Sequence, residues 1–348
     1  MKKTIAMLLA LVMCVALCAC GQSAAPAPAA APAPAAAPAE EDYTEITLQL
    51  SHHNAVDQPI GIALDAWAKE VGELTGGKVT IDVYPAASLY SSGDAQDAVI
   101  MGTLDMCLGD TSLLSSDEPE YALFSLPFMF DSYEVADKVV YGEIGQEIDA
   151  RMEQNLGVKA LGWTWNGFRN MCTKDPIASV ADCKGYKLRS PGADIYLDTF
   201  KTLGMSPEVI SWSECYTAMQ SGVVDGVESG LEAFYTQGFY ALGNNICLSR
   251  HMLSIIGPVI NVDKWNSLNE KTQQMLLDTW AKYVEELDAT VIAGEEDYQA
   301  KLEAENCNIT SFGDRKELID LFTPYWSTNA EGGNYSDLLA KTLDVISQ

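Results

Sequence analysis

Residues 46–83 read ITLQLSHHNAVDQPIGIALDAWAKEVGELTGGKVTIDV and set a pattern that the rest of the chain follows. Apolar and polar residues alternate at 46–50 and again at 79–83, which predicts two strands. Between them, apolar residues recur at helical spacing, with Pro59 to begin a helix and Gly76 to end it. The stretch therefore predicts a strand, helix, strand unit, which is typical of an α/β fold.

The same alternation continues along the chain in two series. The first series adds helices at 94–102 and 133–155 and strands at 106–108 and 158–165. The second series has strands at 186–188, 206–210 and 223–226, a helix at 195–203, and a helix through 216–220. The first series suggests a doubly wound layer, and the presence of two series predicts two lobes.

Two helix starts in the later part of the chain carry a capping-box spacing. Ser211 and Glu214 precede the helix at 216–220, and Ser267 and Glu270 open a helical pattern that runs from 268 to about 305. A helix of that length can span both lobes. We therefore predict an α/β fold of two lobes with a long helix that spans both.

The composition excludes several classes of protein. The 348 residues include 21 Lys plus Arg against 49 Asp plus Glu, which gives a formal net charge of -28. A nucleic-acid binder needs clustered cations to displace the counterions of phosphate, so nucleic acid is excluded as a partner. With 7 Trp, 15 Tyr and 9 Phe, the chain has enough apolar area to fold, which excludes disorder for most of it.

Residues 1–19 are predicted to be an export signal. Lys2 and Lys3 precede an apolar run at 4–19 that is too short for a membrane-spanning helix. The run leads into LCACG at 17–21, which resembles the lipobox of bacterial lipoproteins. In that interpretation Cys20 becomes the first residue and carries a two-chain lipid that anchors the protein to the outer face of the cytoplasmic membrane. The alternative is an ordinary secreted protein with a coincidental cysteine.

Residues 20–42 are predicted to form a tether, because the segment 23–40 is nearly all Ala and Pro and cannot build a core. Six cysteines remain for the body: Cys107, Cys172, Cys183, Cys215, Cys247 and Cys307. An even number in an exported protein permits disulfides, whereas irregular spacing favours buried free thiols. The three histidines show no zinc-site spacing with these cysteines, so we predict no metal and no cofactor.

Arginine is scarce, so its positions are informative. The chain has five arginines, and two of them, Arg169 and Arg189, follow the predicted strands at 161–165 and 186–188. Ligands of open α/β sheets bind beyond the carboxyl ends of strands, and arginine holds a carboxylate with two parallel hydrogen bonds. These arginines therefore either grip an anionic ligand or stabilise the fold through salt bridges, and spacing alone does not separate the two interpretations.

Two more candidates lie at predicted strand ends. Trp212 falls in a loop between a strand and a helix, which favours a flat wall of a ligand pocket. His52 follows the first strand and is either a cleft residue or a surface histidine.

Several motifs together resemble one family. They are WNGFR at 165–169, KGYKLRSP at 184–191 and WSECYTAMQSGVVDGVE at 212–228, with shorter matches at 51–52, 126–128 and 265–268. In these motifs the chain is similar to the DctP-type solute-binding subunits of TRAP transporters. The resemblance covers nearly all of the mature chain.

The resemblance implies a periplasmic-binding-protein-like fold whose two lobes close on a small organic acid. Such a protein is not an enzyme and delivers its ligand to TRAP integral membrane subunits. We place lobe I at residues 43–166 plus 255–294 and lobe II at residues 167–254 plus 295–348.

The resemblance also implies roles for single residues. Arg189 matches the family's carboxylate-clamping arginine, and Arg169 matches a second arginine that often supports the ligand. Asp110 lies where relatives often have a polar or acidic pocket residue, which would take a ligand hydroxyl. Ser229 stands where the family frequently has asparagine, so the usual amide contact becomes a single hydroxyl.

Other functions stay open at this point. A lipoprotein that senses a ligand for a partner receptor, or the binding subunit of an ATP-driven importer, would have the same kind of body. An exported hydrolase is disfavoured, because neither GxSxG nor HExxH occurs in the chain.

Overall fold

The computed structural model describes residues 42–347, so the predicted export signal, Cys20 and nearly all of the predicted tether lie outside the described residues. The first strand, helix, strand unit forms as predicted, with β1 Ile46–Ser51, α1 Pro59–Leu74 and β2 Val79–Tyr84. Pro59 occupies the first turn of α1, where its missing N–H costs no helical hydrogen bond.

A mixed sheet of ten strands runs through the described residues, in the order β2-β1-β3-β9-β5-β8-β6-β7, with β4 and β10 paired to β9. The other strands are β3 Met106–Asp110, β4 Val158–Ala160, β5 Thr164–Thr173, β6 Lys187–Ser190, β7 Ser206–Val209, β8 Gly226–Ser229, β9 Asn245–Asn261 and β10 Asn308–Ser311. β2 and β3 are parallel to β1, and β7 and β8 are parallel to β6. The antiparallel pair β5 and β9 joins these two parallel sets.

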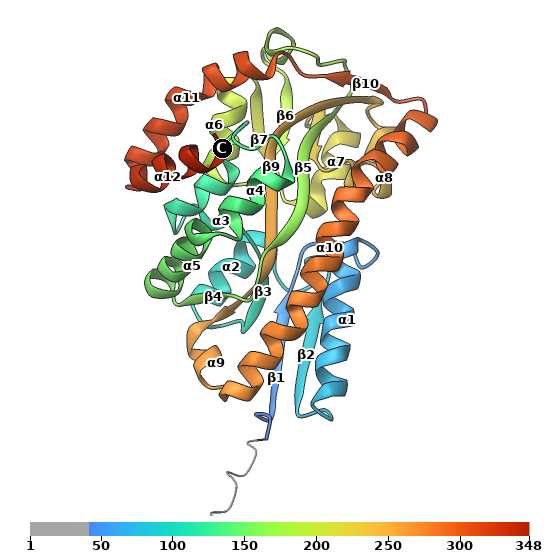
Figure 1. The fold of residues 1–348 in the computed structure, drawn as a ribbon. Coiled ribbons are helices and arrows are strands. Elements are labelled where there is room, and N and C mark those ends of the chain that lie inside the picture. Colours follow the sequence, from blue (N-terminus) through green and yellow to red (C-terminus); the bar gives the residue numbers. More distant parts are fainter. Residues whose placement is uncertain (1–41, 348) are drawn as a thin grey trace, which may run out of the picture. The chain divides into compact units, whose positions relative to one another are not determined.

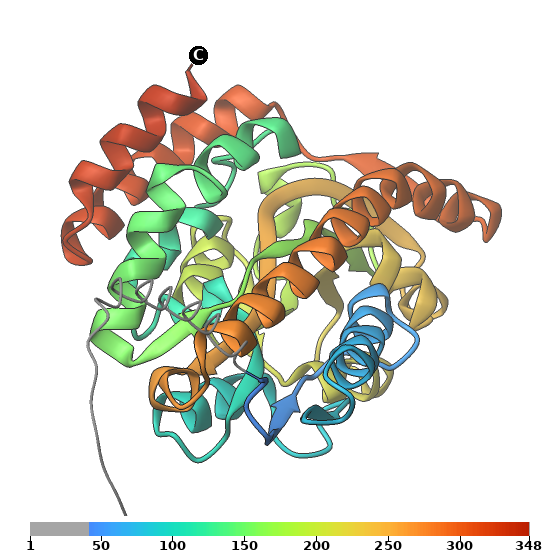
Figure 2. The same ribbon diagram turned by 60° about the horizontal axis from the view of Figure 1, so that its bottom comes forward.

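Helices and short 3-10 turns cover the sheet (Figure 1). The helices are α2 Ser92–Ile100, α3 Thr111–Leu114, α4 Tyr133–Val140, α5 Glu143–Leu156, α6 Asp194–Thr202, α7 Cys215–Ser221, α8 Leu231–Thr236, α9 Val262–Asn266, α10 Glu270–Ala304, α11 Arg315–Gly332 and α12 Ser336–Ile346. The 3-10 turns are η1 Pro119–Ser125, η2 Val180–Cys183, η3 Trp212–Glu214 and η4 Phe239–Ala241. The last helix, α12, packs on α4, α5 and α11 (Figure 2).

Helix α10 joins the two halves of the fold (Figure 1). Its N-terminal half buries Leu276 and Trp280 in an apolar cluster with α1 and β1. Near its other end, Leu302 belongs to a separate apolar cluster with α7 and α8. The architecture is therefore the predicted α/β fold of two lobes, with a long helix that spans both.

The helix predicted at 133–155 is wrong in its continuity, because the chain turns between α4 and α5. A Cβ atom added at Gly142 would lie 2.2 Å from the carbonyl oxygen of Lys138, and one added at Gly145 would lie 1.9 Å from that of Val140. The tight turn thus depends on glycine at both positions. The strand predicted at 158–165 is likewise split into β4 and β5, with Gly162 between them at a φ of 138°.

The predicted helix caps are also wrong. The side chain of Asn269, not Ser267, caps α10 by accepting a hydrogen bond from the backbone N–H of Thr272 at 3.0 Å. The side chain of Ser211 makes no capping hydrogen bond, because the turn η3 precedes α7. The strand predicted at 223–226 begins only at Gly226.

The prediction of a doubly wound layer is wrong because of the direction of β9 in the sheet. This strand of 17 residues crosses the centre of the sheet antiparallel to β3 and β5, so the sheet is mixed. Nearly every residue of β9 is buried, so its sequence lacks the alternation that reveals a half-exposed strand. That uninterrupted burial is the reason the periodicity of the sequence missed it.

Candidate functional site

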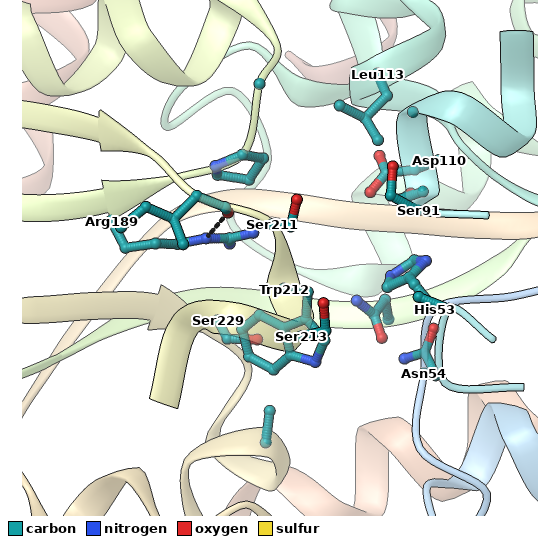
Figure 3. A pocket seen from close by; sticks show the side chains of 18 of the residues that line it. His53, Asn54, Ser91, Asp110, Leu113, Arg189, Ser211, Trp212, Ser213 and Ser229 are labelled. Carbon is teal, nitrogen blue, oxygen red and sulfur yellow. Dashed lines mark hydrogen bonds between the residues drawn. The ribbon is translucent and has the colours of Figure 1, made fainter. Parts of the chain in front are cut away.

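A cavity of about 240 Å³ lies at the carboxyl ends of strands from both parallel sets. It is lined by His53 and Asn54 after β1, Asp110 at the end of β3, Arg189 near the end of β6, residues 210–213 after β7, and Ser229 at the end of β8. Figure 3 shows Arg189 on one side of this space and His53, Asn54 and Ser91 on the other. Because the two sets flank the β5 and β9 pair, their strand ends form opposite walls.

Arg189 is a buried cation on the cavity wall, with 4% of its surface exposed. Its Nε donates a hydrogen bond to the carbonyl oxygen of Ile210 at 2.9 Å, and its Nη1 donates to Oε1 of Glu228 at 3.1 Å. Its guanidinium carbon lies 5.3 Å from the ring centre of Trp212, within the range of a cation–π contact. These contacts fix the orientation of the guanidinium.

Arg169 also lines the cavity but is paired more completely. Its Nε and Nη2 both donate to the carboxylate of Glu228, at 2.5 and 2.7 Å, in a bidentate arrangement. The prediction that Arg169 follows a strand is wrong, because Arg169 lies inside β5. Its guanidinium also lies 5.2 Å from the ring centre of Tyr196.

Glu228 connects the two arginines and is fully buried. Burial alone would raise its pKa, but the charge and hydrogen bonds of Arg169, the proximity of His251 and the charge of Arg189 lower the pKa to about 2. Burial lowers the pKa of His251, whose Nε2 lies 3.6 Å from Oε2 of Glu228. At neutral pH Glu228 is therefore ionised and His251 is neutral.

Two further carboxyl groups line the cavity. Asp110 caps α3 by accepting hydrogen bonds from the backbone N–H and the hydroxyl of Ser112. Glu232, in the first turn of α8, accepts a hydrogen bond from Nε2 of Gln58 at 3.1 Å. Burial raises the pKa of both Asp110 and Glu232, so both sites disfavour additional negative charge.

The structure brings together five of the six predicted site residues. Arg189, Arg169, Trp212, Ser229 and Asp110 all line the cavity, although the ligand role of each stays a prediction. His52 is buried and is not part of the lining, which contains its neighbour His53 instead. Burial, His52 and the two arginines lower the pKa of His53 to about 3, so this imidazole is neutral.

Sequence reasoning missed several polar residues of the site. Glu228 was visible as the last residue of the motif at 212–228, but nothing in the sequence paired it with two arginines. Glu228 lies behind the lining, and the polar lining residues that were missed are Asn54, Gln58, Ser91, Asn166, Ser213 and Glu232. These residues come from separate loops and helices, and no spacing links them.

The state of the cysteines, the absence of a metal-binding group and the absence of a membrane-spanning helix can each be examined in the described residues. All six cysteines of the described residues are buried and free, as the thiol interpretation predicted. Within residues 42–347, no group of three or more His, Cys, Asp or Glu side chains is arranged to hold a metal ion. None of the helices in that range has the length and apolar character needed to cross a membrane.

The fold and the cavity define a class of protein, the two-lobed solute-binding proteins, in which strand ends from both lobes surround a ligand. Within that class the chain belongs to the bacterial extracellular solute-binding protein family 7, known as DctP, whose model matches residues 50–331. The predicted family is therefore confirmed.

Known relatives share this architecture. The C4-dicarboxylate-binding protein DctB of Bacillus subtilis is 30% identical over 244 residues, which are 69% of either chain. A TRAP periplasmic solute-binding protein of Sulfurospirillum deleyianum, solved with bound succinate, is 29% identical with a TM-score of 0.79, covering 87% of this chain and 99% of that one. A second, from a Bradyrhizobium strain and in complex with galacturonate, is 25% identical with a TM-score of 0.80, covering 86% and 100%. Proteins of this family bind solutes for transporters, so the prediction of a protein that is not an enzyme is confirmed.

Proposed function

We propose that this chain is the extracytoplasmic binding subunit of a TRAP-type transporter, which captures a small organic acid through an arginine–carboxylate clamp and delivers it to integral membrane subunits. The observation that carries the proposal is the buried guanidinium of Arg189 on the cavity wall. A guanidinium has five N–H groups, and here Nε and Nη1 have partners, whereas Nη2 has no acceptor among residues 42–347. A ligand carboxylate would accept hydrogen bonds from these remaining groups.

The charges around Arg189 support the same ligand class. Arg169 and Arg189 are positive and Glu228 is negative, so the buried cluster has one positive charge in excess. A buried charge without a partner is costly, and a ligand carboxylate would supply the partner. Relatives whose structures hold succinate or galacturonate bind carboxylates, which agrees with this assignment.

Closure of the lobes would follow from ligand contacts on both walls. We propose lobe I at residues 43–166 plus 255–294 and lobe II at residues 167–254 plus 295–348. A carboxylate on Arg189 would anchor the ligand to the β6 side, and a ligand hydroxyl on Asp110 would anchor it to the β3 side. As water leaves, the ion pair strengthens because the local dielectric constant falls.

The remaining predicted residues would shape the ligand's surroundings. Trp212 would form a flat wall beside Arg189, and Ser229 would offer one hydroxyl. Arg169 would act mainly by holding Glu228 in place. We propose no ligand contact for His52, since it does not line the cavity.

A comparison of acids with their neutral derivatives tests the clamp. Thermal unfolding of residues 43–348 should show stabilisation by at least one small carboxylic acid and none by its methyl ester or amide at equal concentration. A ligand at 100 times its Kd adds about 2.7 kcal/mol to the free energy of unfolding. If esters or amides stabilised the protein as well as the acids do, the arginine–carboxylate clamp would be wrong.

We further propose that Cys20 carries the lipid anchor and that residues 20–42 tether the body to the outer face of the cytoplasmic membrane. Two acyl chains suffice for stable anchoring, whereas none would remain without the cysteine. The full chain should therefore sediment with membranes when expressed in a bacterium, and Cys20→Ser should release it from them. A matched Cys107→Ser variant, which changes a buried thiol of the body, should remain on the membrane. Membrane association of Cys20→Ser would contradict the anchor.

A further inference from the structure

The buried cluster of Arg169, Arg189 and Glu228 offers one excess positive charge and no more. Arg169 and Arg189 are the cations of its lining, and no lysine lines it. The carboxylate of Glu228 holds Arg169 in a bidentate pair and offsets its charge, although Nη1 of Arg169 has no acceptor among residues 42–347. One ligand carboxylate neutralises the excess, and a second would enter without a partner.

The wall opposite Arg189 carries groups that suit hydroxyls rather than a second carboxylate. Figure 3 shows His53, Asn54, Ser91 and Asp110 on that side of the space. The imidazole of His53 is neutral and supplies no cation there, and burial around the carboxyl group of Asp110, like that around Glu232 at the start of α8, disfavours further negative charge. The charges of the cavity are therefore asymmetric, with the positive end at Arg189.

An unpartnered hydrogen-bond acceptor on this wall, Oδ1 of Asn54, also favours a ligand with hydroxyl groups. Asn54 has 5% of its surface exposed, and its Oδ1 has no hydrogen-bond partner among the described residues, while its Nδ2 donates to Oε1 of Gln58 at 3.3 Å. A buried acceptor needs a donor. A hydroxyl can donate to Oδ1, whereas an ionised carboxylate can only accept.

We infer that the ligand is a polyhydroxylated monocarboxylate, of the aldonate or uronate type, whose carboxylate lies on Arg189 and whose hydroxyls reach Asn54, Asp110 and Glu232. The inference rests on the proposed function and selects one substrate class within it. It departs from the C4-dicarboxylates that the name of the Bacillus subtilis relative indicates. Glu232 acts as a specificity residue, because its carboxyl group accepts from a hydroxyl and repels a second carboxylate.

Isothermal titration calorimetry with three kinds of acid tests the inference. Hexuronates and hexonates carry one carboxylate and several hydroxyls, succinate carries two carboxylates on four carbons, and butyrate carries one on the same four carbons. The best sugar acid should bind at least about tenfold more tightly than succinate, since a site built for hydroxyls is left with unpaired groups by a ligand that lacks them. Butyrate should bind no more weakly than succinate, because the second carboxylate contributes only repulsion.

Glu232→Gln separates specificity from folding. The amide keeps the size of the side chain and removes its charge, so the preference for the sugar acid over succinate should fall by about tenfold or more. Glu285→Gln removes the same charge from an exposed position of α10 and should leave the preference unchanged. A preference that Glu232→Gln leaves intact would overturn the role of Glu232.

The outcomes distinguish this inference from the proposed function. If succinate bound more tightly than every sugar acid, the monocarboxylate assignment would be overturned and the arginine clamp would stand. If none of these acids bound, the sugar-acid assignment would be overturned, and the comparison of other small acids with their esters and amides would decide the proposed function separately.

Discussion

Replacing Arg189 with lysine is expected to weaken binding of the organic acid by between about 30-fold and several thousand-fold. Removing one partner of a buried, hydrogen-bonded charge pair costs about 2–5 kcal/mol. Lysine keeps the positive charge but presents no planar fork, and it would lose the hydrogen bond that Nε donates to Ile210. Calorimetric titration of the best acid against wild type and variant measures the loss.

The control for this variant lies on the same strand. Lys187 is an exposed residue of β6, two positions before Arg189, and it does not line the cavity. Lys187→Ala should therefore change affinity by less than twofold, although it removes a positive charge from the same strand. Thermal unfolding of Arg189→Lys without ligand shows whether the variant is folded. A folded Arg189→Lys protein with unchanged affinity would move the carboxylate anchor elsewhere, to Arg169 first.

Replacing Glu228 with glutamine is expected to destabilise the protein by roughly 3–5 kcal/mol, the cost of leaving buried charges without their partner. Glu228 is fully buried, and its two oxygens hold Arg169 and Arg189. The amide is neutral, and its NH₂ group would face guanidinium N–H donors instead of accepting from them. Chemical denaturation at pH 7 measures the difference in the free energy of unfolding.

The pH dependence of this difference has a defined sign. The pKa of Glu228 is about 2 in the folded protein, below the ordinary value of 4.5. Ionised Glu228 therefore contributes stability above pH 4.5, and that contribution is lost as the pH falls toward 2. The gap between wild type and Glu228→Gln should shrink over the same interval.

An exposed glutamate serves as the control for Glu228→Gln. Glu73 pairs with Lys69 at 3.8 Å, and both side chains are mostly exposed. Glu73→Gln should change the free energy of unfolding by less than about 0.5 kcal/mol, because exposed ion pairs contribute little. A loss of less than 1 kcal/mol in Glu228→Gln would mean that water reaches the arginine cluster and screens it.

The secondary structure was predictable where one face of an element is exposed. In α1 the buried residues recur at helical spacing, so both its type and its start at Pro59 could be read from the sequence. In β9 both faces are buried, and the period that marks a strand disappears. The predicted cap of α10 was wrong because both Ser267 and Asn269 are residue types that cap helices, and the side chain of Asn269 is the one that accepts from the backbone N–H of Thr272.

The candidate site was likewise predictable in part: the sequence indicated some of its residues but not their partners. Arg189 and Trp212 were predictable because each lies close to the carboxyl end of a strand, although Arg189 lies within β6 and not after it as predicted. The edge of a parallel sheet where ligands bind is known from strand direction alone. The partners of Arg189 were not predictable. Ile210 and Glu228 lie 21 and 39 residues further along the chain, and only the pairing of β6 with β7 and β8 brings them to the guanidinium.

The sequence by itself determined the α/β class, the family and the presence of a carboxylate-binding arginine as a candidate, because local periodicity and short motifs encode these features. Only the tertiary structure decided which charges remain in excess. Glu228 neutralises one of the two arginines, while Asp110 and Glu232 place negative groups on the cavity wall. The sum of charges inside a cavity depends on side chains from separate strands and helices, and it exists only once the sheet has assembled.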